Sequence, residues 1–265
     1  MAIVFSRTLD LLARRGPISV FVRDDDVDQD EESLHRLIDL CMELQVPLSL
    51  AVVPGLLTDA AADYLMSVAR QAPGLLELHQ HGWLHRNHEA PGEPPAEFGS
   101  KRSFDDQLAA LKSGRRRMDE AFGEAWYPGF TPPWHASNRD TIDALVACGF
   151  EAYSGSAESV RAFDDFDALC KVPVTLDVDY IVESQGKIRS QSAIHLFEQM
   201  MEYHFAGLLL HHKKMTPEGF AFLRSWLTPL RKHSGAQFET LRSLARRKEP
   251  FVFTGPLDRF RPVSE

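Results

Sequence analysis

Apolar, β-branched runs alternate with segments of helical periodicity along most of this chain, and this alternation is the strongest constraint on its fold. The runs span residues 18–22, 47–53, 75–78, 126–130, 150–153, 174–181, 208–210 and 251–253. The helical segments span residues 33–44, 58–71, 103–122, 137–148, 190–204 and 217–230. Repeated strand–helix units build parallel sheets, and this many units in 265 residues favour a closed barrel over a doubly wound sheet. We therefore expect one α/β barrel domain over residues 1–265.

Composition excludes several classes of protein. With 44% hydrophobic and 25% charged residues, the chain has the balance of an ordinary globular domain, not of a disordered one. No uncharged apolar run reaches the roughly 18 residues that a membrane span needs. The net charge of −9 argues against a nucleic-acid partner. Charged residues interrupt the N-terminal segment before a signal-peptide core forms, and the three cysteines are widely spaced, so we expect a cytoplasmic protein with free thiols.

Asp and His residues, which can bind metal ions or transfer protons, cluster where the expected strands end. The first strand runs directly into Asp24-Asp25-Asp26, and the third is followed by the sequence HQHGWLHRNH at 79–88. The fourth leads into GFTPPWH at 129–135, and a late strand ends in His211-His212. In a parallel barrel all these strand ends lie at one face, which is where active sites are built. We therefore expect four clusters that are distant in sequence to converge.

One Asp and two imidazoles form a ligand set suited to catalytic zinc or a similar divalent ion, with a coordination position left open. A second carboxylate beside such an ion can take a proton from the attacking water, and a His across the site can protonate the leaving group. The sequence therefore predicts metal-assisted hydrolysis. Amide, ester and cyclic-amide substrates all remain open at this point, and so does the imidazole pair, since His79 and His81 share one strand face while His81 and His85 are four apart.

Simpler explanations compete with a site in the acidic stretch, where seven of the 38 acidic residues lie between Asp24 and Glu32. A solvated acidic loop is one. A calcium-binding EF-hand is another, but counting from Asp26 its required Gly is Glu31 and its final Glu is Leu37. Aspartates directly after a buried strand are costly unless they are paired or metal-bound, which favours a functional role for the first three. The later acids suit the start of the next helix.

The order of these motifs resembles the polysaccharide deacetylase family, also called NodB-homology or carbohydrate esterase family 4. The resemblance covers roughly residues 19–212. It implies a distorted (β/α)7-type, TIM-like barrel and zinc-dependent hydrolysis of an N- or O-acyl group, usually acetyl, on a carbohydrate. It also implies that Zn²⁺, or another divalent ion such as Co²⁺, Ni²⁺ or Mn²⁺, is the cofactor.

The resemblance assigns roles residue by residue. It implies Asp25 as catalytic base and Asp26 as metal ligand, with the register one residue earlier, Asp24 and Asp25, left open. The family's H-x-x-x-H motif matches His81 and His85 as the two metal imidazoles.

Two further motifs match the other side of the site. The Pro-aromatic motif matches Thr131-Pro132-Pro133-Trp134, which implies that the main-chain N–H of Trp134 stabilises the oxyanion. The Leu-x-x-His motif makes His211 the general acid, oriented by the carboxylate of Asp179 or Asp177.

Departures from the family pattern qualify the expected substrate. Val27-Asp28 replaces the usual Gly-Pro, and Thr131 replaces the Arg that pairs with the base, so Arg23 or Arg102 is needed to supply that charge. We expect a small, cytoplasmic acylated amino sugar or related glycan. Residues 97–99 and Arg102 are expected at the mouth of the site. A metal-dependent hydrolase of other non-peptide C–N bonds, such as ureides or formamides, and a non-catalytic glycan- or metal-binding barrel are the alternatives, and a homo-oligomer is left open.

Overall fold

The computed structural model describes residues 17–163, 165, 167–178 and 205–247. Its centre is a parallel sheet with the strand order β6-β5-β4-β3-β2-β1-β8-β7, and β9 pairs with the start of β1. The strands are β1 (Ile18–Val27), β2 (Leu48–Val52), β3 (Leu76–His81), β4 (Trp126–Thr131), β5 (Ala152–Ser156), β6 (Cys170–Val174), β7 (Leu176–Asp177), β8 (Phe205–Leu210) and β9 (Ala236–Glu239).

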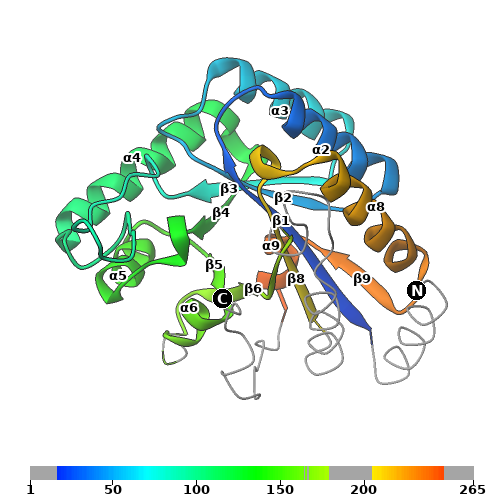
Figure 1. Ribbon diagram of the computed structural model, residues 1–265. Helices are drawn as coiled ribbons and strands as arrows, with labels where there is room; N and C mark the ends of the chain where they lie inside the picture. The colour runs from blue at the N-terminus through cyan, green and yellow to red at the C-terminus, as the bar shows by residue number, and fades with distance from the viewer. Residues whose placement is uncertain (1–16, 164, 166, 179–204, 248–265) are drawn as a thin grey trace.

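Helices cover the outer side of this sheet (Figure 1). They are α2 (Glu32–Leu44), α3 (Asp59–Gln71), α4 (Phe104–Phe122), α5 (Arg139–Ala147), α6 (Ala157–Arg161) and α8 (Pro217–Lys232). The short helix α9 (Leu241–Ala245) lies instead among the strands, where Leu241 and Leu244 pack with Phe21. Three 3-10 turns, η1 (Gly123–Ala125), η2 (Pro133–His135) and η4 (His212–Lys214), complete the described elements. Ser103 caps the N-terminus of α4, because its hydroxyl accepts the N–H of Asp106. The helix expected from Ser137 begins instead after Asn138, whose side chain caps it.

The sheet curls into a nearly closed barrel, so the predicted distorted (β/α)7 architecture is confirmed. Its central strand, β1, lies between β2 and β8, and every residue from Ile18 to Asp25 is buried. A strand covered on both faces needs a mostly apolar run, which the sequence ISVFV supplies with Ser19 as its one polar residue. Burying each of the four apolar side chains contributes about 1.5–3 kcal/mol. This rigid strand delivers the aspartates to the face where the strands end.

The structure corrects several expected boundaries. β1 continues through the three aspartates to Val27. The run at 174–181 is not one strand, because β6 pairs with β5 while β7 pairs with β8, and Thr175 lies at this change of partner. Three further elements, β9, α6 and α9, are too short to show a clear period and were not expected from the sequence. The segments expected at 190–204 and 251–253 lie outside the described residues.

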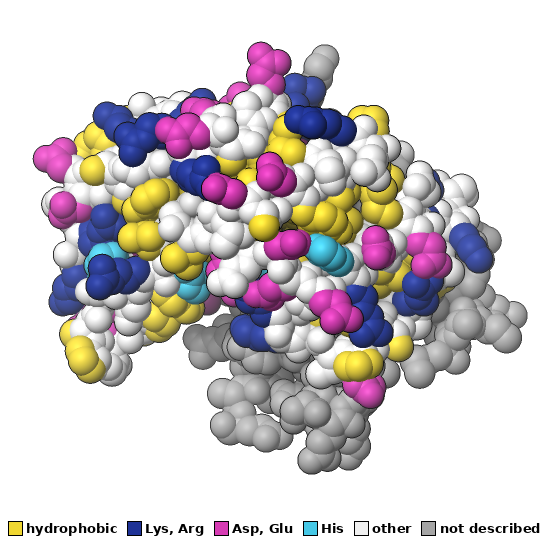
Figure 2. Space-filling model, turned by 90° about the horizontal axis from the view of Figure 1, so that it is seen from above, with side chains coloured by type: hydrophobic (Ala, Val, Ile, Leu, Met, Phe, Trp, Pro, Cys, Tyr) yellow, Lys and Arg dark blue, Asp and Glu magenta, His cyan; other side chains and the backbone are white. Residues whose placement is uncertain are grey.

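All three cysteines are free, as predicted. No helix in the described part of the chain is both long enough and apolar enough to cross a bilayer. Figure 2 shows basic and acidic side chains interspersed over the face seen from above, with no broad field of one sign.

Candidate metal and catalytic site

A bulge at the end of β1 turns two consecutive aspartates toward the same space. Neighbouring side chains of a regular strand point to opposite faces, so Asp25 and Asp26 cannot both face the barrel opening without a backbone irregularity. The pairing of β1 with β2 shifts between Asp24 and Val27, and Asp26 adopts a left-handed φ of 66°. Such strained backbone at a non-glycine residue persists where surrounding structure enforces it, often at functional sites.

Asp26, His81 and His85 come together at this opening, with one ligand atom from each residue within 4.8 Å of the others. Oδ1 of Asp26 lies 3.3 Å from Nε2 of His81 and 3.0 Å from Nε2 of His85. His81 ends β3, whereas His85 lies in the following loop, where its φ of 51° is also left-handed. One carboxylate oxygen and two imidazole nitrogens thus converge from two strand ends.

The donor chemistry of these three residues fits a divalent ion. The Nδ1–H of His81 donates to the main-chain oxygen of Thr131 at 3.0 Å, which leaves the lone pair on Nε2, the nitrogen that faces Asp26. His79 does not join the set. Its Nε2 shares a hydrogen bond of 2.9 Å with the hydroxyl of Thr131, and burial beside Arg23 lowers its pKa to about 3. Of the imidazole pairs left open by the sequence, the structure brings His81 and His85 to Asp26.

The electrostatic interactions among these residues favour an ionised Asp26 and a protonated His81. Burial would raise the pKa of Asp26, but its hydrogen bonds to His81 and His85 outweigh burial and hold that pKa far below its usual range. Burial would lower the pKa of His81, but Asp26 and Asp25 together raise it. The Asp26 carboxylate therefore stabilises positive charge beside it, and it would stabilise a bound cation in the same way.

Arg23 supplies the charge that Thr131 does not. Its Nη2 donates to Oδ2 of Asp25 at 2.9 Å, its Nε lies 2.8 Å from Oδ1, and its Nη1 donates to Ser154 Oγ at 2.7 Å. Arg23 is fully buried, so this two-point pair is shielded from water. Burial would raise the pKa of Asp25, yet Arg23, followed by His81, lowers it on balance. Arg102, the other candidate, instead donates to the main-chain oxygens of Glu97 and Asp106.

Asp24 points to the opposite side of β1 and has a different partner. Its Oδ2 lies 2.6 Å from Nδ1 of His212, and its Oδ1 accepts the main-chain N–H of His212 at 2.8 Å. Burial raises the pKa of Asp24, and Asp24 in turn raises that of His212 against the effect of burial. Because His212 occupies both oxygens of Asp24, the geometry favours Asp25 and Asp26 over the earlier register.

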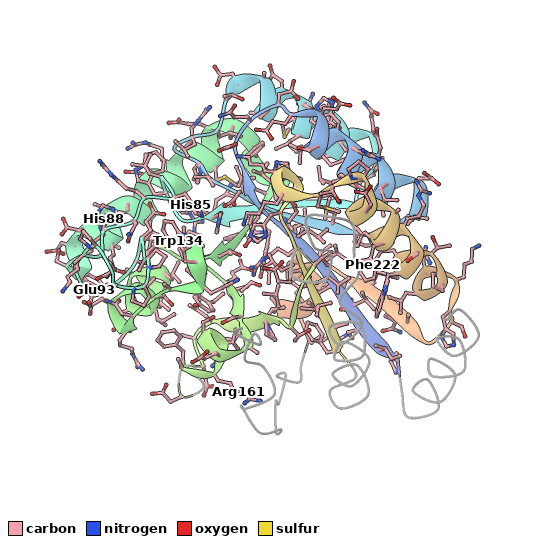
Figure 3. All side chains as sticks on the ribbon, in the orientation of Figure 1. His85, His88, Glu93, Trp134, Arg161 and Phe222 are labelled. Carbon is pink, nitrogen blue, oxygen red and sulfur yellow. The ribbon has the colours of Figure 1, made fainter. Side chains whose placement is uncertain are left out.

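Trp134 and His135 follow β4 in η2, both with a φ of 55°. The Trp134 ring lies 4.3 Å from that of His85, and Figure 3 shows the two side chains next to each other. Among the described residues, the main-chain N–H of Trp134 has no hydrogen-bond partner. That N–H is therefore available to an oxygen atom of a bound molecule.

The predicted general acid, His211, and one of its two candidate partners, Asp177, lie among the described residues. His211 follows β8 directly and is partly exposed, and its charge acts on the carboxyls of both Asp24 and Asp25. Asp177 ends β7, paired with Leu209 of β8. Asp179 lies outside the described residues.

Sequence reasoning missed the roles of three residues at this site. Burial, followed by the charge of Arg23, lowers the pKa of His135 to about 3, which favours the neutral form of this imidazole near Asp25. Ser154 holds Arg23 from the middle of β5, and no sequence signal marked it. Glu97 was expected at the mouth of the site but is 1% exposed.

Solved structures of carbohydrate-active enzymes are similar to this chain. A putative polysaccharide deacetylase from Mycobacterium smegmatis has a TM-score of 0.64 at 18% identity, over 91% of this chain and 95% of that one. A family 4 acetyl xylan esterase from Clostridium thermocellum, in complex with a cobalt ion, has a TM-score of 0.57 at 16% identity, over 85% and 89%. The chain has the polysaccharide deacetylase fold.

This deacetylase fold also occurs in a protein described as catalytically inactive. A CE4 family pseudoenzyme from Bacillus anthracis has a TM-score of 0.54 at 14% identity, over 86% of this chain and 66% of that one. No protein-family model and no curated protein sequence matches the chain. The deacetylase fold alone therefore does not separate an enzyme from an inactive relative, and activity depends on the residues of the site.

Proposed function

We propose that the protein is a metal-dependent deacetylase that removes an N- or O-acyl group, with acetyl as the first candidate, from a small carbohydrate-type substrate. The observation that carries this proposal is the convergence of Asp26, His81 and His85 beside an Asp25 carboxylate that is paired with the buried Arg23. A binding-only protein has no need for a second oriented carboxylate next to its ligand set. Hydrolysis does need one.

Asp26, His81 and His85 are the proposed ligands of Zn²⁺ or of Co²⁺, Ni²⁺ or Mn²⁺. Such an ion supplies Lewis-acid polarisation of the acyl carbonyl and of the attacking water. Asp25 accepts the proton of that water, and Arg23 holds its two oxygens in a fixed orientation. The low pKa of Asp25 keeps it ionised and able to act as a base at neutral pH.

Two groups on the opposite side of the site, the main-chain N–H of Trp134 and the imidazole of His211, act on the oxyanion and on the leaving group. The main-chain N–H of Trp134 donates to the oxygen that becomes negative when water adds to the carbonyl. His211 gives a proton to the leaving amine or alcohol as the C–N or C–O bond breaks. Asp177 or Asp179 is the proposed partner that orients His211.

The test is hydrolysis by metal-free protein reloaded with each of the four ions, with released acetate measured on acetylated amino sugars and on acetylated xylan. We expect binding of a single ion per chain and turnover that depends on it. Asp25→Asn should lower kcat/KM by about 10²–10⁴-fold with the ion retained, the range for loss of a general base. His85→Ala should lose the ion itself.

Asp30→Asn is the matched control, because Asp30 lies on the same acidic stretch but pairs with His35 at the surface, and its activity should equal that of the wild type. Cyclic ureides and formamides are assayed in parallel, and turnover of these alone would replace the acyl-carbohydrate assignment. A bound ion without hydrolysis of any of these substrates would support the binding-only alternative.

A further inference from the structure

The loop between the two metal-site histidines wraps around a buried carboxylate. Glu97 accepts three successive main-chain N–H groups, those of Trp83 at 3.1 Å, Leu84 at 2.7 Å and His85 at 3.2 Å. Oε2 accepts from Trp83 and His85, and Oε1 accepts from Leu84. A buried carboxylate is costly unless hydrogen bonds satisfy it, and here the backbone of the loop provides them.

The rest of the loop backbone is fixed as well. The N–H of Gly82 donates to the Thr131 oxygen at 3.1 Å, and the Gly82 oxygen accepts from Gln80 Nε2 at 2.8 Å. The oxygen of Trp83 accepts the N–H of Gly55 at 2.9 Å. Residues of β3, of β4 and of the turn after β2 thus hold the first half of the loop. Glu97 supplies the hydrogen bonds for the second half, which carries His85.

The loop sequence is adapted to this arrangement at Gly82. A Cβ atom at this position would lie 2.1 Å from Oε2 of Glu97 and 2.6 Å from Cγ of Pro133. Gly82 also has a φ of 56°, in the left-handed region that favours glycine. Glycine is therefore required both by the backbone turn and by the approach of the Glu97 carboxylate.

Glu97 is itself anchored from behind. The next residue, Phe98, is fully buried, pairs with Ser137 through an isolated parallel bridge, and packs edge-on against Phe130 with ring centroids 5.2 Å apart. The Nη1 of Arg102 donates to the main-chain oxygen of Glu97 at 3.3 Å. These contacts hold Glu97 in place in the connection between β3 and α4, and the loop residues 83–85 are arranged around its carboxylate.

We propose that Glu97 is a positioning residue that orders the loop carrying His85 before any ion binds. The inference rests on the proposed metal site and adds what prepares it. Without Glu97, three adjacent N–H groups lose their acceptors and His85, with its left-handed backbone, is free to turn away from Asp26. Residues that orient metal ligands in this way typically change metal affinity when they are replaced.

The test compares Glu97→Gln with Glu93→Gln. Glu93 is the control, because it also lies between β3 and α4 and receives the same substitution. Its side chain is exposed and points away from His85 (Figure 3). In metal-free protein, the amides of residues 83–85 should exchange about 10-fold faster or more in Glu97→Gln and at the wild-type rate in Glu93→Gln. The Kd for Co²⁺ should rise by about 10- to 100-fold in the first variant only.

A Glu97→Gln protein with wild-type loop exchange and a wild-type Kd would overturn the proposal. So would exchange that accelerates equally across the sheet, because that pattern belongs to general destabilisation. If Glu97→Gln does not fold, the wild type still decides. Its loop amides should be protected without metal, and exchange at the rate of exposed amides would refute pre-ordering. Absence of Co²⁺ binding in the wild type would remove the proposed function, while the exchange comparison would still determine whether Glu97 orders the loop.

Discussion

Asp24 and Asp25 are neighbours on β1 and both are buried, but the two sides of the strand surround them differently. On the inner side, Asp25 meets the permanent charge of Arg23 through two contacts. On the outer side, Asp24 meets His212, an imidazole whose charge depends on pH. The pKa of Asp25 is lowered and that of Asp24 is raised. A fixed cation keeps a carboxylate ionised for chemistry, whereas a titratable partner allows a proton to be shared.

The largest difference between the two sides should appear when the inner cation is removed. Arg23→Met leaves Asp25 buried without its partner, so the free energy of unfolding should fall by about 3–5 kcal/mol. The pKa of Asp25 should rise, which moves the acid limb of the kcat/KM profile to higher pH. Urea unfolding and a pH–rate profile measure the two effects. The double variant Arg23→Met/Asp25→Leu should recover stability, and failure to do so would show that the loss came from packing.

The outer side should respond less. Asp24→Asn keeps the shape of the side chain but weakens its two hydrogen bonds to His212, so the free energy of unfolding should fall by about 1–3 kcal/mol. Because Asp24 faces away from the ligand set, the variant should retain bound metal and most of its activity. Unfolding curves and metal content are the measurements. Loss of activity with the ion retained in Asp24→Asn would instead support the earlier register, in which Asp24 is the base and Asp25 the ligand.

A third difference concerns the pH dependence of stability, where the buried imidazoles of His79 and His212 should act in opposite directions. The folded pKa of His79 is about 3, below its ordinary value of 6.5, so between these values only the unfolded chain binds the proton. Stability should therefore fall as pH drops through this window, by about 1.4 kcal/mol per pH unit. His212 has a raised pKa, so its contribution is complete below 6.5 and is lost as pH rises through the folded value.

Variants separate these two contributions. His79→Gln should remove part of the acid-side slope of the metal-free protein, because His135, whose pKa is also lowered to about 3, adds to the same slope. His212→Gln should remove the alkaline-side loss. Thermal unfolding across the pH range measures both. An unchanged acid-side slope in His79→Gln would show that this imidazole titrates normally in the folded protein.

The sequence predicted the architecture well because the apolar period of a buried parallel strand is a local signal. It predicted the order of the strand ends for the same reason, and hence the face where Asp26, His81 and His85 meet. It did not predict the split between β6 and β7, since a change of strand partner leaves no mark in the apolar pattern.

The side-chain partners were harder to predict. Arg23 was one of two candidates for the charge beside Asp25, and only the three-dimensional alternation along β1 distinguishes it from Arg102. The carboxylate of Glu97 binds main-chain N–H groups, which every residue carries, so no residue type at 83–85 indicates the contact. Contacts made to backbone atoms escape sequence reasoning for this general reason.

The position of β1 in the sheet also has a consequence for how the chain is made. β1 is the first described strand, but one of the strands that it pairs with is β8, which follows much later in the chain. Ser19 of β1, for example, pairs with Phe205 of β8. During synthesis the edge of β1 that will face β8 remains without its partner until most of the chain has been translated. Contacts between such distant segments slow folding and expose apolar strand edges on the way. The strand that carries the proposed base is thus among the first translated and among the last to be fully paired.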